Sequence, residues 1–240
     1  MKKYIILIIL AFAAISSKAQ FSIGYSVGYG AYEMNDMKDI FDASLSSLKA
    51  TYPQVDFRMV DDFPGYVNHT IDAGYRFKRH EVGLKTSFLT TGGKISYSDY
   101  TGEYLDKLKL NGYRIALSYR YYLPICEIGK SGSLSLYGEL SEGITFTNTD
   151  YKGHIKIFDE TMEFSGSALD KNTISYTVMP QIGAKLNITP NIGFLVGIGY
   201  DFHFEGNVYK QSNFYGHNIK KRVDWSGIRL NAGVAYTFGK

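Results

Sequence analysis

Three polar residues near position 200 are the strongest candidates for chemistry in this sequence. Asp201, His203 and Glu205 are spaced by two, so an extended strand places all three on one face. Imidazole and carboxylate groups in that arrangement can ligate a metal or exchange protons with a substrate. The alternative is a polar interior wall. The sequence favours the wall, because no second histidine falls on the matching face of a neighbouring strand.

Nucleophilic chemistry has less support than the acid–base site. The chain lacks a G-x-S-x-G elbow, and His69 falls on the apolar face of its strand, where packing is its expected role. Cys126 is the only cysteine, which excludes an internal disulfide. The acidic residues Asp56, Asp61 and Asp62 lack the residue order of a calcium-binding loop. We therefore expect no catalysis, no metal and no cofactor.

The N-terminus has the pattern of a secretory signal peptide. Lys2 and Lys3 precede an apolar run, and small residues at Ser17 and Ala19 are spaced for cleavage. The apolar run is short of the ~20 residues that a spanning helix needs. We predict that residues 1–19 are removed and that residues 20–240 form the mature domain.

Charge and composition exclude some classes of partner. Without the lysines of the signal peptide, the mature chain has equal numbers of basic and acidic residues, so nucleic acid is not an expected partner. Tyrosine (21) and glycine (25) are abundant and proline (5) is scarce. Twisted strands with aromatic ends suit that mixture.

The mature sequence contains eight segments in which apolar and polar residues alternate. Their lengths suit tilted membrane strands, which need roughly 9–11 residues within the hydrocarbon. The last segment sets Ile228, Leu230 and Val234 on one face against Arg229 and Asn231 on the other. The predicted strands are residues 21–31, 67–77, 82–88, 110–123, 134–146, 176–186, 192–205 and 226–238.

The links between these strands alternate in length. Residues 78–80, 124–132 and 187–191 are short links, and the long links are 32–66, 92–109, 148–173 and 206–225. This alternation is typical of short periplasmic turns and long extracellular loops. The sequence thus predicts an all-β fold, a membrane-spanning antiparallel up-and-down barrel with both termini in the periplasm.

The closing strand Ala235-Tyr236-Thr237-Phe238, together with the signal peptide and the alternating strands, resembles small outer-membrane β-barrels of the OmpA/OmpX or porin-like type. The resemblance implies a Gram-negative outer-membrane location, surrounded by outer-membrane lipids and lipopolysaccharide. It also implies that Tyr236 and Phe238 serve as the assembly signal recognised by the barrel-assembly machinery.

The polar faces of the strands carry charges of both signs. An eight-stranded barrel is just wide enough for side chains to fill it, and buried charges must be paired or solvated. We expect a hydrogen-bonded network across the lumen. Inward glycines such as Gly193, Gly197 and Gly199 argue against a filled lumen, because they leave space along their strand. The predicted network is Asp72, Arg76, Glu81, Lys85, Arg114, Arg120, Glu139, Lys185, Asp201, His203, Glu205 and Arg229.

Three of the long links have patterns of their own. In 32–66, Asn35 or Asp36 can cap an amphipathic helix that ends before Pro53; it either covers the barrel mouth or engages a partner, or it packs only its own loop. Residues 154–164 predict a projecting hairpin whose edge could pair with another chain. In 206–225, the basic run Lys220-Lys221-Arg222 is either a lipopolysaccharide contact or a solvated face.

These patterns favour a structural or interaction barrel. We expect its loops 32–66, 148–173 and 206–225 to bind an extracellular ligand or protein. A narrow porin-like channel for ions or small solutes is the alternative, and a lipid-modifying enzyme is a third and weaker one.

Overall fold

The computed structural model describes residues 20–100, 102–129, 131–158, 160–164, 172–204, 209–210 and 220–238, without the side chains of 209, 210, 220 and 221. The predicted signal peptide 1–19 and Glu205 lie outside these residues.

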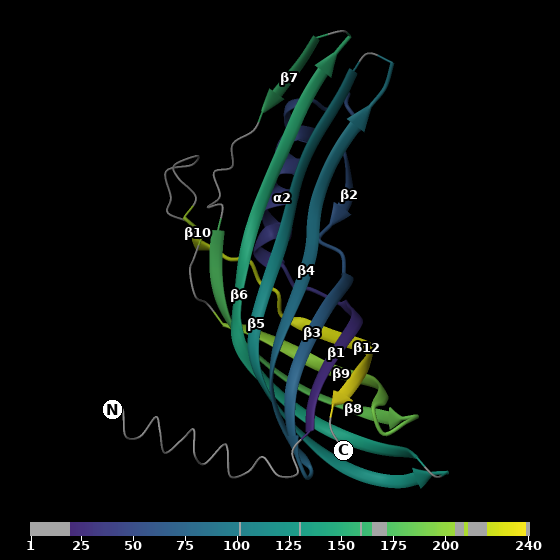
Figure 1. The fold of residues 1–240 in the computed structure, drawn as a ribbon. Coiled ribbons are helices and arrows are strands. Elements are labelled where there is room, and N and C mark those ends of the chain that lie inside the picture. The colour runs from purple at the N-terminus through teal and green to yellow at the C-terminus, as the bar shows by residue number, and fades with distance from the viewer. Residues whose placement is uncertain are drawn as a thin grey trace.

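Eight antiparallel strands close into a barrel (Figure 1). Closure is complete because the first strand pairs with the last along its length, from Phe21 opposite Phe238 to Gly30 opposite Arg229. In order around the ring the strands are β1 (Gln20–Gly30), β3 (Tyr66–Phe77), β4 (His80–Ser98), β5 (Gly102–Ile128), β6 (Gly132–Ile157), β8 (Asn172–Asn187), β9 (Ile192–Phe204) and β12 (Gly227–Phe238).

The two faces of the barrel wall differ in polarity as the alternation predicts. Apolar side chains point outward and stay exposed, among them Ile71 at 56%, Leu117 at 67% and Ile182 at 67%. The polar positions between them point inward and are buried. A water-soluble sheet would hide the apolar face instead, so the exposed band suits a hydrocarbon environment.

Three strands continue far beyond the ring. β4, β5 and β6 are 19, 27 and 26 residues long, and β5 alone extends roughly 90 Å at about 3.3 Å per residue. Short strands β2 (Arg58–Asp62) and β7 (Glu160–Phe164) pair with β4 and β6. The resulting sheet β2-β4-β5-β6-β7 is named the extension (Figure 1).

The extension corrects one prediction and confirms another. Residues 92–109 are not a long loop; they are paired strand from Gly92 opposite Lys109 to Ser98 opposite Glu103. The polar run Thr90-Thr91-Gly92-Gly93-Lys94 has the composition of a loop, but pairing with both neighbouring strands keeps it extended. The hairpin predicted at 154–164 is confirmed by the pairing of β6 with β7.

Helix α2 (Asn35–Thr51) supplies a second core outside the ring. Its residues Met37 and Phe41 are buried in one apolar cluster with Ile95 and Leu108 of the extension and with Phe63, which directly follows β2. The helix therefore packs on the inner, concave face of the extension sheet, behind β4, β5 and β6 in Figure 1. The helix contacts β4 as well as β2 of its own loop, so it does not pack only its own loop.

The start of α2 differs from the prediction. Met34, in a left-handed conformation, holds the N-cap position and provides no side-chain capping bond, so neither Asn35 nor Asp36 is the cap. The Asp36 carboxylate instead accepts a hydrogen bond of 3.0 Å from the backbone N–H of Arg222. Among the residues that the structure describes, no helix is both long and apolar enough to cross a membrane.

The hairpin at the opposite end of the barrel is longer than predicted. β5 runs on to Ile128 and β6 begins at Gly132, which leaves a tight turn where 124–132 was expected to be a link. The register shifts between Pro124 and Cys126. Pro124 keeps Ser135 of β6 as its register partner, but pairing of β5 with β4 ends at Tyr121. The backbone N–H of Tyr122 points to the β4 side, where it donates to Arg79, and Pro124 has the same facing. The strand passes through Pro124 because its missing N–H falls at an open edge.

Candidate functional site: the barrel lumen and its mouth

A cluster of charges fills the lumen toward the short turns. The Glu139 carboxylate, which is fully buried, accepts from Lys85 through Oε1 and from Arg120 through Oε2, at 2.7 Å from Nε and 2.6 Å from Nη2. Arg120 also reaches Oε1 of Glu81 at 2.7 Å, and the Tyr122 hydroxyl donates to Oε2 of Glu81 at 3.1 Å. These five residues, from three adjacent strands, are the lower cluster.

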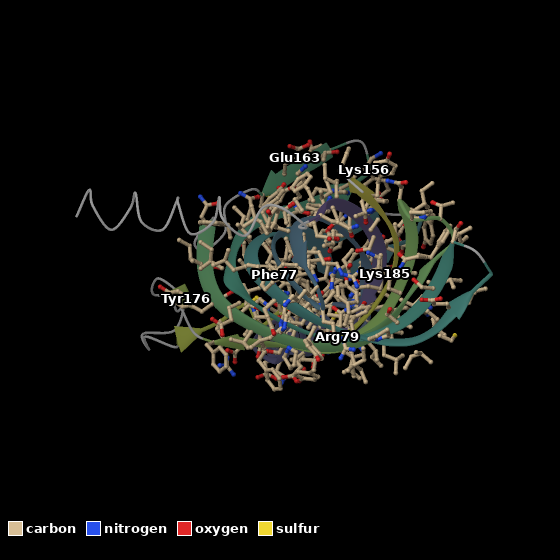
Figure 2. The ribbon with its side chains drawn as sticks, turned by 60° about the horizontal axis from the view of Figure 1, so that its bottom comes forward. Phe77, Arg79, Lys156, Glu163, Tyr176 and Lys185 are labelled. Atoms are coloured by element: carbon tan, nitrogen blue, oxygen red, sulfur yellow. The ribbon has the colours of Figure 1, made fainter. Side chains whose placement is uncertain are left out.

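Two further cationic side chains, Arg76 and Lys185, lie over the aromatic ring of Tyr122 at the edge of the lower cluster. The Arg76 guanidinium lies 4.1 Å from the centroid of the Tyr122 ring, and the Lys185 ammonium lies 5.5 Å from it. Lys185 is only 2% exposed, and Figure 2 shows it among the side chains that fill the ring. Asp72 and Arg76 are partly exposed, so the network reaches solvent on that side.

A second cluster lies toward the mouth and is centred on Asp201. Its carboxylate, fully buried, is 2.9 Å from Nη1 of Arg114 and 3.3 Å from Nη2 of Arg229, and it accepts a hydrogen bond from the Thr177 hydroxyl. His203 is 3.4 Å from the same carboxylate. These five residues are the upper cluster. One buried acid thus balances two buried arginines.

Arg229 connects the upper cluster to the residues that lie at the mouth of the barrel. It donates to the backbone oxygens of Ala31, at 2.8 Å, and of Trp225, and its guanidinium lies 4.7 Å from the Tyr32 ring. Trp225 is fully buried, packs edge-on against Tyr32, and donates through Nε1 to Thr147 at 2.8 Å. The mouth is therefore covered by an aromatic pair.

Serine, histidine and aspartate meet in the upper cluster in an order that invites comparison with a nucleophilic triad. The Ser175 hydroxyl is 3.0 Å from Nδ1 of His203, whose Nε2 faces Asp201. Nε2 makes no hydrogen bond, and the Asp201 carboxylate is already taken by Arg114, Arg229 and Thr177. The Ser175–His203 pair therefore lacks the hydrogen bond from imidazole to carboxylate that orients the histidine in a triad.

The space between the two clusters is small. A cavity of about 40 Å³ is lined by Asn68, Lys85, Arg114 and Gln181 among others. That volume suits one or a few waters. The unpaired Nε of Arg114, Oε1 of Gln181 and Nδ2 of Asn68 are buried groups that such waters can satisfy.

The inward glycines do not open the lumen, which corrects the expectation drawn from strand β9. A methyl group at Gly197 would overlap Gln181 and come within 2.6 Å of the Tyr137 hydroxyl, and one at Gly183 would overlap the Tyr137 ring. Large polar side chains already lie across these glycines. Gly193 is likewise covered, by Lys185.

In the structure, eleven of the twelve network residues lie on the inward side of the wall, and Glu205 lies outside the described residues. Among the residues that the structure describes, no group of three or more His, Cys, Asp or Glu side chains could hold a metal ion, and Glu205 of the Asp201, His203 and Glu205 set lies outside them. Reasoning from the sequence missed Tyr122, Tyr137 and Trp225. Alternation does place Tyr137 on the polar face, and this was the available signal.

A further buried acid lies in the extension. Asp106 is 7% exposed on the concave face, and its Oδ1 has no hydrogen-bond partner. Burial raises the pKa of Asp106, and a hydrogen bond with Tyr151 opposes the rise. Burial and the neighbouring Asp106 also raise the pKa of Tyr104 to about 12.

Comparison with known proteins gives the fold its name. No protein-family model and no curated protein matches the chain. Among solved structures, the chain is similar to the outer membrane protein OprG of Pseudomonas aeruginosa, with 13% identity, a TM-score of 0.52, and coverage of 92% of this chain and 97% of that one. The fold is an outer-membrane β-barrel.

Another solved barrel also aligns with this chain. Neisserial surface protein A aligns with 92% of this chain and 100% of its own, with 14% identity and a TM-score of 0.43. Identities this low extend the similarity to the fold alone.

Proposed function

We propose that this chain is an integral outer-membrane protein that binds a partner outside the cell, and that it neither conducts solutes nor catalyses a reaction. The observation that carries the proposal is the excess length of β4, β5 and β6. A membrane strand needs roughly 9–11 residues, and the 27 residues of β5 exceed that at both ends. Residues 124–128 enter the hairpin at the short-turn end, and residues 102–111 continue into the extension.

The extension suits a binding role because it is ordered by its own core. Met37 and Phe41 of α2 pack against the sheet, so the outer face of the extension is held rigidly above the wall. We place the extension outside the cell and both termini in the periplasm, since short turns join the strands at the other end.

The filled lumen argues against a channel. The carboxylates of Glu139 and Asp201 are fully buried and bound by four cationic side chains, and Trp225 with Tyr32 covers the mouth. A narrow channel remains the second candidate, because the cavity of about 40 Å³ lies between the clusters and could join a water path if one cluster moved.

Conductance in planar bilayers distinguishes the two. We expect the purified wild-type protein to give little steady current and Glu139→Ala to raise it, since the alanine removes the acid that holds Lys85 and Arg120 across the lumen. Ser98→Ala, in the extension, is the matched control and should leave conductance unchanged. A large and stable wild-type current would refute the closed lumen and favour the channel.

The orientation has its own test. A protease site inserted within 165–171, next to the β6–β7 hairpin, should be cut on intact cells, whereas one inserted at 188–191, in the β8–β9 turn, should be cut only after the outer membrane is opened. Cleavage in the reverse order would place the extension in the periplasm and overturn the extracellular role.

A further inference from the structure

A row of lysines crosses the outer, convex face of the extension. Lys94 of β4 and Lys107 of β5 are direct register partners, and Lys107 is in turn the partner of Lys152 of β6. Lys109 lies two residues along β5 on the same face. The alternate residues, such as Leu108, are buried in the core on the other side, so the lysines face outward. These four residues are the lysine row.

The positive charge of the lysine row is only partly neutralised. Like charges placed directly opposite on neighbouring strands repel one another and destabilise the pair. Lys152 reaches the Asp150 carboxylate at 3.5 Å. Within the described part of the chain, Lys94, Lys107 and Lys109 form no ion pair, although Asp61 of β2 is the register partner of Lys94 and Asp150 of β6 that of Lys109. A multiply charged anion would relieve the repulsion across the row.

The lysine row lies on the same face as the lipid-facing wall below it. Phe88, Tyr113 and Phe146 are register partners on β4, β5 and β6, and they form an aromatic row at the upper edge of the exposed apolar band. The rings of Phe88 and Tyr113 are 5.4 Å apart. Aromatic residues of this kind mark the membrane interface in such barrels.

Two residues beyond the aromatic row on each strand, the outward side chains are polar and uncharged. Thr90 donates to Asn111 at 3.1 Å, and Asn148 donates to Asn172 at 3.2 Å. Lys107 lies six residues beyond Tyr113 on β5, or about 20 Å along the strand. With the usual tilt of 35–45°, that is about 15 Å above the interface. Figure 1 shows β4, β5 and β6 running without a break from the ring into the extension.

We propose that the lysine row binds the phosphorylated saccharide head of a lipid whose acyl chains lie against the barrel wall below. A simple phosphoglycerol head reaches only about 5–8 Å beyond the hydrocarbon, which is too short for Lys107. A head built of several phosphorylated sugars reaches it, and one continuous face carries the chains, the interface and the charges of the same molecule. This inference rests on the membrane location and orientation of the proposed function.

The test uses the full-length mature protein in phosphatidylcholine nanodiscs. Three probes are added in turn: a rough lipopolysaccharide with a phosphorylated core, the same lipid after enzymatic dephosphorylation, and the phosphorylated oligosaccharide freed of its acyl chains. The variant is Lys94→Gln/Lys107→Gln. The control, Lys49→Gln/Lys156→Gln, removes the same charge from exposed positions outside the row. Bound lipid is counted by native mass spectrometry.

We expect the double variant to bind the phosphorylated lipid about tenfold or more weakly than wild type, and the control to bind within about twofold, because each lysine near an anionic head contributes separately. Dephosphorylation should weaken wild-type binding to the level of the double variant. Equal retention by variant and wild type would overturn the proposal. If the free oligosaccharide binds as tightly as the lipid, the acyl chains contribute nothing to binding, and the proposal that the ligand is a lipid is wrong.

The lipid-binding result can be distinguished from the results that test the proposed function. A large wild-type conductance would refute the closed lumen and leave lipid retention at the lysine row unaffected. Cleavage of the tags in reverse order would refute the orientation, and the inference with it, even if the nanodisc assay detected binding.

Discussion

Glu139 holds the lower cluster together, and replacing it with alanine tests how much the filled lumen stabilises the barrel. The side chain is fully buried, and both of its oxygens are engaged, one by Lys85 and the other by Arg120. Removing one partner of a buried pair costs about 3–5 kcal/mol, because the remaining charge stays buried without compensation. The structure places Glu139→Ala near the lower end of that range, at about 3 kcal/mol.

Two features of the site set that magnitude. Arg120 keeps Glu81 at 2.7 Å and the Tyr122 hydroxyl at 3.1 Å, so it loses only one of its partners. Lys85 loses its carboxylate, but it also lines the cavity of about 40 Å³, where water can solvate the ammonium. Most of the loss therefore comes from Lys85.

The measurement is urea unfolding of the protein refolded in lipid vesicles, followed by tryptophan emission. Trp225 is the only tryptophan in the chain and is fully buried at the mouth, so its emission reports the barrel directly. Lys152→Ala removes an ion pair whose side chains are 72% and 47% exposed, and it should cost no more than about 1 kcal/mol.

The double variant Lys85→Met/Glu139→Leu completes the test. It should recover much of the loss, since replacing a whole buried pair with apolar groups is often neutral or stabilising. A Glu139→Ala cost equal to that of Lys152→Ala would refute the reasoning that the lumen charges are energetically coupled.

Three further predictions concern other parts of the molecule. Leu230→Arg, on the outer wall, should cost about 2–4 kcal/mol in vesicle unfolding, since it places a charge in hydrocarbon; a neutral effect would contradict the lipid-facing assignment. Gly183→Ala should lower the unfolding midpoint because its methyl overlaps Tyr137, whereas Gly138→Ala, with no atom within 4 Å, should not; equal midpoints would count against the tight lumen. Burial raises the pKa of Asp106, so the extension should lose stability as pH rises from the unfolded value through the higher folded one, and Asp106→Asn should flatten that dependence in amide hydrogen exchange of β5; an unchanged pH profile would contradict it.

The sequence predicted the barrel because the alternation of polar and apolar residues is a local property of each strand. All eight ring strands occur where the period of two placed them, and the closure of β1 on β12 followed from their count and direction. Burial divides the faces as the alternation requires. The inward charges were identified for the same reason, since facing is fixed once a segment is a strand.

Pairing partners across the lumen could not be predicted in that way. The sequence shows that Glu139 and Lys85 point inward, but only strand curvature and shear bring Glu139 to both Lys85 and Arg120 while Asp201 receives Arg114 and Arg229. These residues lie 19 to 87 positions apart in the chain.

The extension was decided by tertiary structure for a different reason. Residues 90–110 have a loop-like composition, and they remain extended because β4 and β5 pair with each other and α2 covers their inner face. The lysine row exists only through this register, since Lys94, Lys107 and Lys152 are distant in sequence and adjacent in the sheet. The sequence by itself determined which side of each strand is polar, because the direction of a side chain depends only on its place in the alternation. The closed sheet decided which residues meet across the lumen, because it alone fixes the alignment of one strand with the next.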